Sequence, residues 1–167
     1  MTVAIRPLAE ADAEACDGIV ATLPYQFGNE KGRRDCAAAV RLQRGLVAEN
    51  DGEVVGFLTV ESRFDDCSEV TWMAVRADRR RRGVGRMLLD RLAADTLADG
   101  RHLLLVLTVS PSDGPDEVLD GYQATRAFYE ANSFVLARDF AGYWDSDTPV
   151  LMIRALHEFP FGPDDSL

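Results

Sequence analysis

A run of arginines and glycines gives the chain the composition of an anion-binding turn. The run follows an apolar stretch and precedes a pattern typical of an amphipathic helix; it reads Arg79-Arg80-Arg81-Arg82-Gly83-Val84-Gly85-Arg86. The first N–H groups of a helix have no partner inside the helix, and the helix dipole adds positive potential there. Glycine lets an anion approach the backbone, and arginine adds charged donors. The segment therefore predicts a phosphate site, and more specifically a pyrophosphate site.

Two other phosphate motifs are excluded by the residues present. A nucleotide P-loop needs Gly-Lys followed by Ser or Thr, and the dinucleotide fingerprint needs a third glycine besides Gly83 and Gly85. Charge runs also occur on solvated faces and in nucleic-acid patches. The formal net charge of −10 is opposite to that of a nucleic-acid-binding protein, so we expect a local anion instead.

The elements that must position this turn follow from apolar periodicity and from turn residues. A strand over 69–75 leads into the turn, a helix begins at Val84 and is capped by Gly100, and a nearly continuous apolar strand covers 102–109. An acidic loop with two prolines over 110–121 precedes a helix over 122–132. The remaining expected elements are strands at 3–6, 46–49, 54–60, 134–140 and 150–156 and helices at 9–23 and 33–43, which gives the order β-α-α-β-β-β-α-β-α-β-β.

Two motifs in this setting resemble the GNAT superfamily of acyl-coenzyme A N-acyltransferases. Arg80-x-x-Gly83-x-Gly85 after a strand is similar to the family signature Arg/Gln-x-x-Gly-x-Gly/Ala. The pair Phe128-Tyr129, followed by Ser133-Phe134, resembles the family's Phe/Leu-Tyr and Gly-Phe pairs, with serine replacing the usual glycine.

The resemblance implies a fold of the α+β class. The family has a mixed, mostly antiparallel seven-stranded sheet flanked by about four helices, in which a splayed parallel strand pair holds acyl-coenzyme A. We expect one such domain over residues 1–167, with 157–167 as a frayed tail.

The same resemblance implies an activity and a set of cofactor contacts. The activity is transfer of acetyl from acetyl-coenzyme A to a primary amine, by direct attack in a ternary complex and without a metal. The cofactor contacts carried over by position are Met73, Ala74, Val75, Arg80, Arg81, Arg82, Gly83, Val84, Gly85, Arg86 and Tyr129. Helical spacing adds Arg126, which shares a helix face with Tyr129 and could reach the cofactor. The alternative for Arg126 is a surface arginine paired with Glu130, and Tyr122 stands where the family often has asparagine.

Proton transfer in the family assigns roles to two residues here. Tyr129 corresponds to the general acid that protonates the coenzyme A thiolate, although the same residue could only pack on the cofactor. Glu69 corresponds to a general base near the start of a strand, acting directly or through water. Regular alternation places Glu69 on the face of Met73, unless a bulge changes the parity. Alternatively, Glu69 is a solvent-exposed carboxylate at the start of the strand, with no catalytic role. Lesser candidates for the base are Glu61, Asp65 and Asp66.

The amine acceptor is expected beside the first-helix loop and the loop over 110–122. Tyr25, Phe27 and Glu69 are the candidate substrate-binding residues, although simple packing explains the two aromatic residues equally well. Because the lining is aromatic and acidic, we expect an amine in apolar surroundings. A small-molecule amine is favoured, and the alternatives are a protein lysine or N-terminus, or an acyl-coenzyme A sensor without turnover.

Bulk composition supports a globular enzyme. The 167 residues are 47% hydrophobic, and no apolar run reaches membrane-spanning length, so we expect a cytoplasmic protein with neither a membrane nor a nucleic-acid partner. The spacing of the three cysteines is not that of a metal site. The sequence leaves open whether the protein forms a homodimer. Lys31 is the only lysine among many arginines, which hints at a bacterial genome rich in GC.

Overall fold

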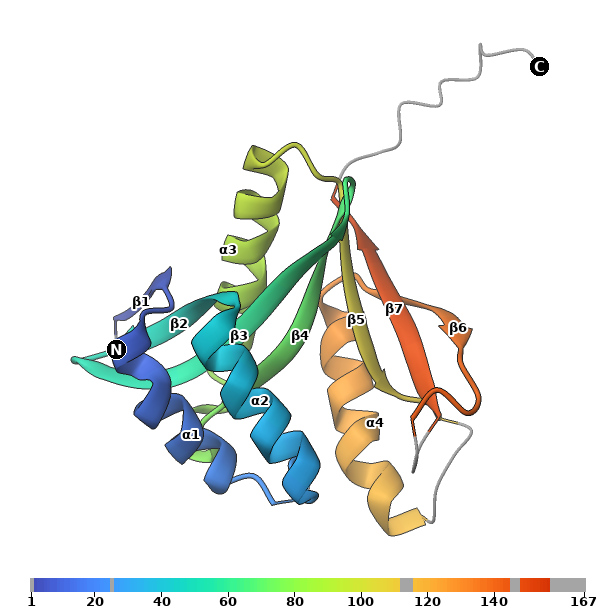
Figure 1. Ribbon diagram of the computed structural model, residues 1–167, viewed down its shortest axis with the longest axis horizontal. Helices are drawn as coiled ribbons and strands as arrows, with labels where there is room; N and C mark the ends of the chain where they lie inside the picture. The colour runs from blue at the N-terminus through green and yellow to red at the C-terminus, as the bar shows by residue number, and fades with distance from the viewer. Residues whose placement is uncertain (1, 25, 112–115, 145–147, 157–167) are drawn as a thin grey trace.

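The backbone of this computed structural model forms one seven-stranded sheet with helices on both faces (Figure 1). It describes residues 2–24, 26–111, 116–144 and 148–156, with the backbone alone for 116–121. The strand order is β1-β2-β3-β4-β5-β7-β6, and every neighbouring pair is antiparallel except the parallel pair β4 and β5. The strands are β1 (Val3–Pro7), β2 (Arg44–Asn50), β3 (Glu53–Phe64), β4 (Cys67–Val75), β5 (Leu103–Val109), β6 (Val135–Asp139) and β7 (Pro149–Ala155). The predicted α+β fold with a mixed, mostly antiparallel sheet is confirmed.

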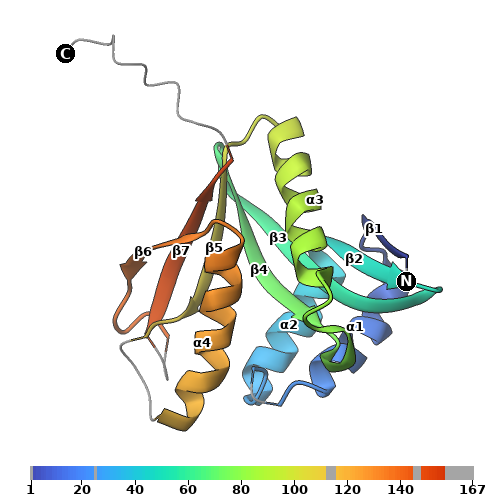
Figure 2. The same cartoon turned by 180° about the vertical axis from the view of Figure 1, so that it is seen from behind.

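Four α-helices cover the sheet, two on each face (Figures 1 and 2). They are α1 (Ala13–Ala21), α2 (Glu30–Leu42), α3 (Val84–Ala98) and α4 (Asp116–Ala131). On one face, α1 and α2 pack on Val47, Phe57 and Ala74; on the other, α3 and α4 enclose the larger apolar core. Within the described residues, no helix has the length and apolar character needed to cross a membrane.

The order of elements matches the expectation, but two helices begin earlier than predicted. Helix α4 begins at Asp116 rather than at 122, since acidic residues after a proline favour a helix start, and the expected loop 110–121 is shorter. Helix α2 begins at Glu30 because the Asn29 side chain caps it by accepting a hydrogen bond from the Gly32 N–H. The expected tail 157–167 lies outside the described residues.

The parallel strands β4 and β5 separate partway along their length. Their ladder pairs Cys67 with Leu103 and ends at Val70 with Val106, although β4 continues to Val75 and β5 to Val109. The ends of β4 and β5 that no longer pair with each other therefore form the sides of a wedge, as the family resemblance implied.

A bulge in β4 lies where the wedge opens. Consecutive residues Thr59 and Val60 of β3 pair with Trp72 and Val70, so Thr71 is an extra residue on β4. The Thr71 hydroxyl hydrogen-bonds Thr59 and also donates to the side-chain amide oxygen of Gln43, beyond the end of α2. The bulge reverses the alternation, so that Trp72 and Ala74 pack towards α1 and α2 while Met73 and Val75 pack towards α3.

Candidate active site

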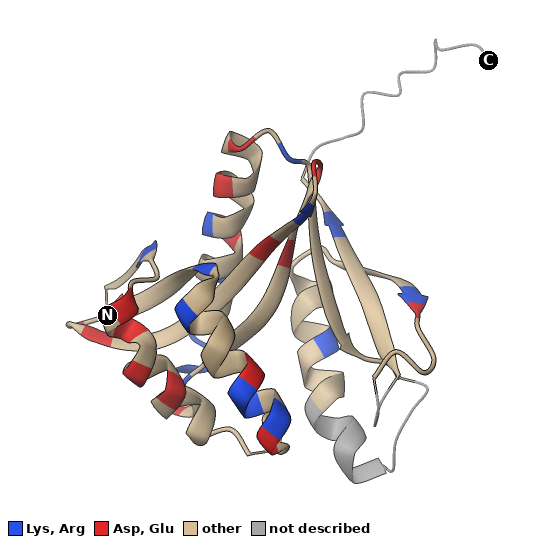
Figure 3. Cartoon of the chain, viewed as in Figure 1, with Lys and Arg blue, Asp and Glu red and all other residues tan. Residues whose placement is uncertain are grey.

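A cavity of about 670 Å³ occupies the wedge between β4 and β5. Its walls come from β4, β5, α4, the start of α2 with the preceding loop, and the segment between β6 and β7. The lining residues are Gln26, Phe27, Asn29, Lys31, Gly32, Asp35, Trp72, Met73, Val106, Leu107, Thr108, Val109, Tyr122, Thr125, Tyr129, Tyr143 and Trp144. The strand ends beside the wedge carry no charged residue, and Figure 3 shows them in tan. The part of the cavity between the two strands is thus lined without charged side chains.

The arginine–glycine turn connects β4 to the start of α3. A 3-10 turn (Ala77–Arg79) follows β4, Arg81 and Gly83 have positive φ values of 59° and 79°, and Gly83 directly precedes the helix. Because the first intrahelical hydrogen bond runs from Met87 N–H to the Gly83 carbonyl, the N–H groups of 84–86 precede the helical ladder. The first turn of α3 contains no acidic residue. This geometry is that of an anion site.

Arg79 is half-buried and pairs with Asp78, whereas the other arginines of the turn are exposed. Arg80 donates to the Val75 carbonyl at 3.2 Å, and Arg86 lies 3.5 Å from Asp90 on the next helical turn. Within the described part of the chain, neither Arg81 nor Arg82 makes an ion pair. Two guanidinium groups are therefore available to an anion at the helix start.

Gly85 connects this turn to α4 by close packing. A Cβ atom at Gly85 would lie 2.9 Å from Cζ of Phe128 and 3.3 Å from Cε of Met73. Glycine is required here because the Phe128 ring occupies the space of a side chain. The motif glycines thus have different roles. Gly83 adopts a positive φ, and Gly85, which has no side chain, lets Phe128 of α4 pack against the start of α3.

Tyr129 is buried with its hydroxyl directed at β4. Its exposed fraction is 5%, and its ring makes edge contacts with Phe128 and Phe134, each at 5.2 Å between centroids. The hydroxyl donates to the Met73 sulfur at 3.9 Å, which is a weak acceptor. Burial raises the pKa of the phenol, so it remains protonated at neutral pH. The residue is a buried proton donor that lines the cavity.

Arg126, one turn earlier on α4, is fixed to the end of β5. The residue is 8% exposed, and its guanidinium donates to the Val109 carbonyl at 2.7 Å. Thr125 and Tyr129 line the cavity, whereas Arg126 is absent from the lining of its described part. The contact joins α4 to the diverging strand, and a direct cofactor contact by Arg126 stays a prediction.

Glu69 lies on the α1–α2 face because of the bulge, so the placement expected from regular alternation is wrong. It pairs with Glu61 across β3 and β4, and Val70 beside it packs in the same core as Met73. Arg63 holds both carboxylates, at 2.7 Å from Glu69 and 3.1 Å from Glu61. Glu69 is not among the described residues that line the cavity.

A chain of hydrogen bonds nonetheless leads from these carboxylates towards the wedge. The Gln43 side chain donates to Glu61 at 2.7 Å and accepts from the Thr71 hydroxyl. Thr71 immediately precedes Trp72, which lines the cavity. This chain ends at Glu61 rather than at Glu69, so any role of Glu69 in proton removal must involve water.

The acceptor side contains one predicted residue and several that sequence reasoning missed. Phe27 lines the cavity and packs on Trp72 at 5.8 Å between ring centroids. Tyr25 lies outside the described residues. Tyr143 and Trp144 were missed; the available signal was an aromatic pair directly after Gly142, between two expected strands.

Comparison with known proteins identifies the family. A family model described as "Acetyltransferase (GNAT) domain" matches residues 41–136, which is more than half of the chain. The chain therefore belongs to the GNAT acetyltransferase family. A search of curated proteins found no match to the sequence.

Solved structures share the fold at low sequence identity. A GNAT-family protein from Desulfovibrio desulfuricans has a TM-score of 0.78 at 21% identity, covering 93% of this chain and 100% of that one. The ribosomal-protein-S18-alanine N-acetyltransferase from Escherichia coli has a TM-score of 0.73 at 18% identity, covering 99% and 100%. An aminoglycoside 6'-N-acetyltransferase complexed with coenzyme A has a TM-score of 0.69 at 15% identity, covering 96% and 99%.

Proposed function

We propose that this protein transfers an acetyl group from acetyl-coenzyme A to a primary amine by direct attack in a ternary complex. The observation that carries the proposal is the wedge itself. The ends of β4 and β5, which no longer pair with each other, enclose a cavity lined by Tyr129. The start of α3, whose first turn has no acidic residue, follows the end of β4. Family membership and a similar structure that holds coenzyme A support the same assignment.

The residues of the turn fit the diphosphate of coenzyme A. Arg81 and Arg82 would supply charged donors, and the N–H groups of 84–86 would supply neutral ones. The bound cosubstrate supplies an activated acyl group as a thioester. The backbone of Met73, Ala74 and Val75, beyond the last residue of β4 that pairs with β5, is positioned to bind its pantetheine arm and polarise the carbonyl.

Tyr129 serves as the general acid of this reaction. The amine nitrogen forms a bond to the acyl carbon, the carbon–sulfur bond breaks, and the Tyr129 phenol donates its proton to the departing thiolate. The Met73 sulfur is a weak hydrogen-bond acceptor, so the phenol loses only a weak hydrogen bond when it turns to the thiolate. The phenolate is then reprotonated from solvent.

Glu69 serves as the base that removes the amine's proton. The carboxylate is held by Arg63 and is not among the described residues that line the cavity, so water must carry the proton to it. If Glu69 has this role, its replacement should change the pH dependence of the rate.

Coenzyme A binding tests the phosphate turn. Calorimetric titration of wild-type protein should show binding, and Gly83→Glu should abolish it, because a carboxylate would face the diphosphate. The matched control is Gly52→Glu, since Gly52 has a similar positive φ of 81° with open space around it but lies in the β2–β3 hairpin. Equal coenzyme A affinity in wild type and Gly83→Glu would refute the assignment.

Turnover is tested by thiol release from acetyl-coenzyme A against a broad panel of amines. The panel includes peptides with a free N-terminus or a lysine, because one of the similar structures is a ribosomal-protein-S18-alanine N-acetyltransferase. Amine-dependent thiol release supports the proposed function. Coenzyme A binding with no amine-dependent release would identify a sensor instead.

A further inference from the structure

The acceptor half of the cavity is walled by four aromatic side chains from three separate segments. Phe27 precedes α2, Trp72 follows the β4 bulge, and Tyr143 and Trp144 lie between β6 and β7. Phe27 and Trp72 pack on each other, whereas Tyr143 is 67% and Trp144 37% exposed. The buried Phe27 and the half-buried Trp72 thus form a floor, and Tyr143 and Trp144 stand more open to solvent at the mouth.

Of the exposed pair, Tyr143 is held in place by its own segment. The Tyr143 N–H donates to the Phe140 carbonyl at 3.2 Å, and the two rings lie 6.3 Å apart. The Arg138 guanidinium covers the Phe140 ring at 5.4 Å, and Gly142 has a positive φ of 75° that allows the turn. Exposed aromatic surface on an ordered turn beside a cavity is typical of a binding site whose ligand covers it.

The charges on this wall are already balanced. Among the described lining residues, Lys31 and Asp35 are the charged pair, and they form an ion pair at 2.7 Å on successive turns of α2. Gln26 and Asn29 add neutral amides. The described wall therefore offers aromatic faces to a ligand, while the net charge of −10 attracts a cationic amine from a distance.

We propose that the acceptor is a primary amine carried on an aromatic ring, with Trp72, Tyr143 and Trp144 binding the ring. This inference rests on the proposed acetyl transfer and deepens it by naming the acceptor class. A ring inserted between the floor and the mouth would cover the exposed aromatic surface and direct the amine into the wedge. Because the one carboxylate on the described part of the wall, Asp35, is paired with Lys31, we expect polycations such as aminoglycosides or polyamines to be poorer acceptors.

The tryptophans provide a binding assay that does not depend on turnover. The chain has two tryptophans, Trp72 and Trp144, and both line the cavity. In the presence of coenzyme A, titration with 2-phenylethylamine should change their fluorescence at concentrations at least about tenfold lower than butylamine or spermidine requires. Equal or tighter binding of butylamine, spermidine or an aminoglycoside would overturn the proposal.

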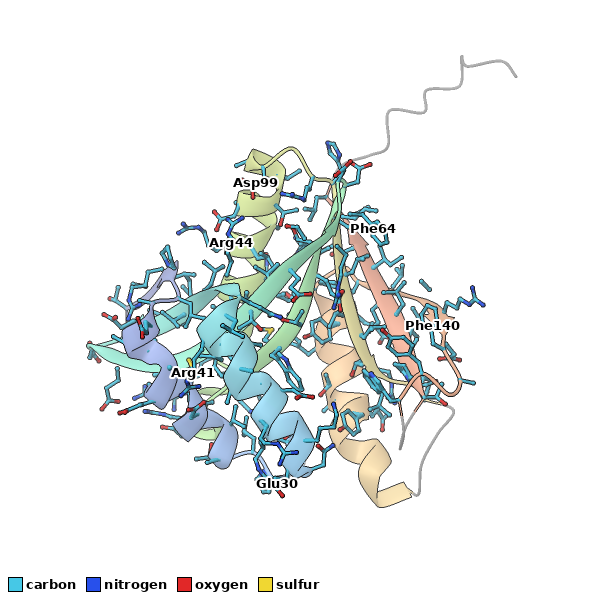
Figure 4. All side chains as sticks on the ribbon, viewed as in Figure 1. Glu30, Arg41, Arg44, Phe64, Asp99 and Phe140 are labelled. Atoms are coloured by element: carbon cyan, nitrogen blue, oxygen red, sulfur yellow. The ribbon has the colours of Figure 1, made fainter. Side chains whose placement is uncertain are left out.

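Variants then locate the ring. Trp144→Ala and Tyr143→Ala should each raise the KM for 2-phenylethylamine by about tenfold and leave the KM for acetyl-coenzyme A unchanged. The control is Phe64→Ala, because Phe64 is 74% exposed at the opposite end of β4 from the cavity mouth (Figure 4). An unchanged KM in both mouth variants would contradict the proposal.

Failure of the activity can be told apart from failure of this inference. If 2-phenylethylamine binds selectively but no amine is acetylated, the aromatic site stands and acetyl transfer is wrong; binding constants from fluorescence then replace KM in the comparison of variants. If spermidine or an aminoglycoside is acetylated in preference, the acetyltransferase stands and the aromatic acceptor is wrong.

Discussion

The ring of Phe128 on α4 occupies the space where a side chain at Gly85 would begin. A Cβ atom at Gly85 would lie 2.9 Å from Cζ of Phe128, under the shortest separation that Cβ atoms normally show. The contact joins the start of α3, with its anion site, to the helix that carries Tyr129. The two halves of the proposed site are therefore packed together at one point.

Gly85→Ala should accordingly disturb both halves. We expect a loss of stability of about 1–3 kcal/mol from overpacking, with weaker coenzyme A binding. Adding Phe128→Leu should recover part of both losses, because it removes the atoms that clash. Thermal unfolding and calorimetry of the single and double variants measure this coupling; simple additivity of the two substitutions would show that the contact is unimportant.

Tyr129→Phe should keep coenzyme A binding and lower turnover by roughly 10²–10⁴-fold, the range typical of a lost general acid. Burial raises the pKa of the phenol above its usual value near 10, so the proton is present throughout the neutral range. Wild-type activity should therefore show no decline from Tyr129 ionisation below about pH 10. Steady-state rates for the variant within about twofold of wild type would reduce Tyr129 to a packing residue.

Glu69→Gln should lower the rate at neutral pH and move the ascending limb of the pH–rate profile upward. The amide keeps the size and polarity of the side chain but cannot take a proton, so ionisation of the amine in solution would then control the rate. Glu61→Gln is the comparison variant, because Glu61 lies opposite, contacts the same arginine and is itself a candidate base; a shifted profile in that variant alone would assign the base to Glu61. Superimposable profiles of kcat/KM for wild type and Glu69→Gln would make Glu69 structural.

Ser133→Gly should stabilise the protein by about 1 kcal/mol. Ser133 ends α4 with a positive φ of 68°, which glycine adopts without strain, and the Phe134 N–H closes the turn on the Tyr129 carbonyl at 3.0 Å. The prediction is checked by thermal or chemical unfolding. A melting temperature equal to or below that of wild type would contradict it.

Local patterns predicted the elements well because their causes are local. The hairpin at Asn50-Asp51-Gly52 is confirmed by positive φ values of 53° at Asp51 and 81° at Gly52, and the order of strands and helices is as expected. The Gly83 turn before α3 is likewise where its sequence placed it.

Features that depend on distant partners could not be predicted in the same way. The Thr71 bulge is defined by pairing with β3 and by a hydrogen bond that Thr71 donates to Gln43, so alternation within β4 alone placed Glu69 on the wrong face. Tyr143 and Trp144 reach the cavity only because β6 and β7 fold back beside β5. The packing of Gly85 under Phe128 likewise joins segments that sequence spacing does not relate.

The most direct test of acetyl transfer is to follow the acetyl group itself. Wild-type protein is incubated with acetyl-coenzyme A labelled in the acetyl group and with the amine that releases thiol fastest, and thiol and labelled product are both counted. The account predicts one acetylated amine for each thiol released, with both rates falling together in Tyr129→Phe. Thiol release without labelled amide, or labelled amide formed equally well by Tyr129→Phe, would contradict it.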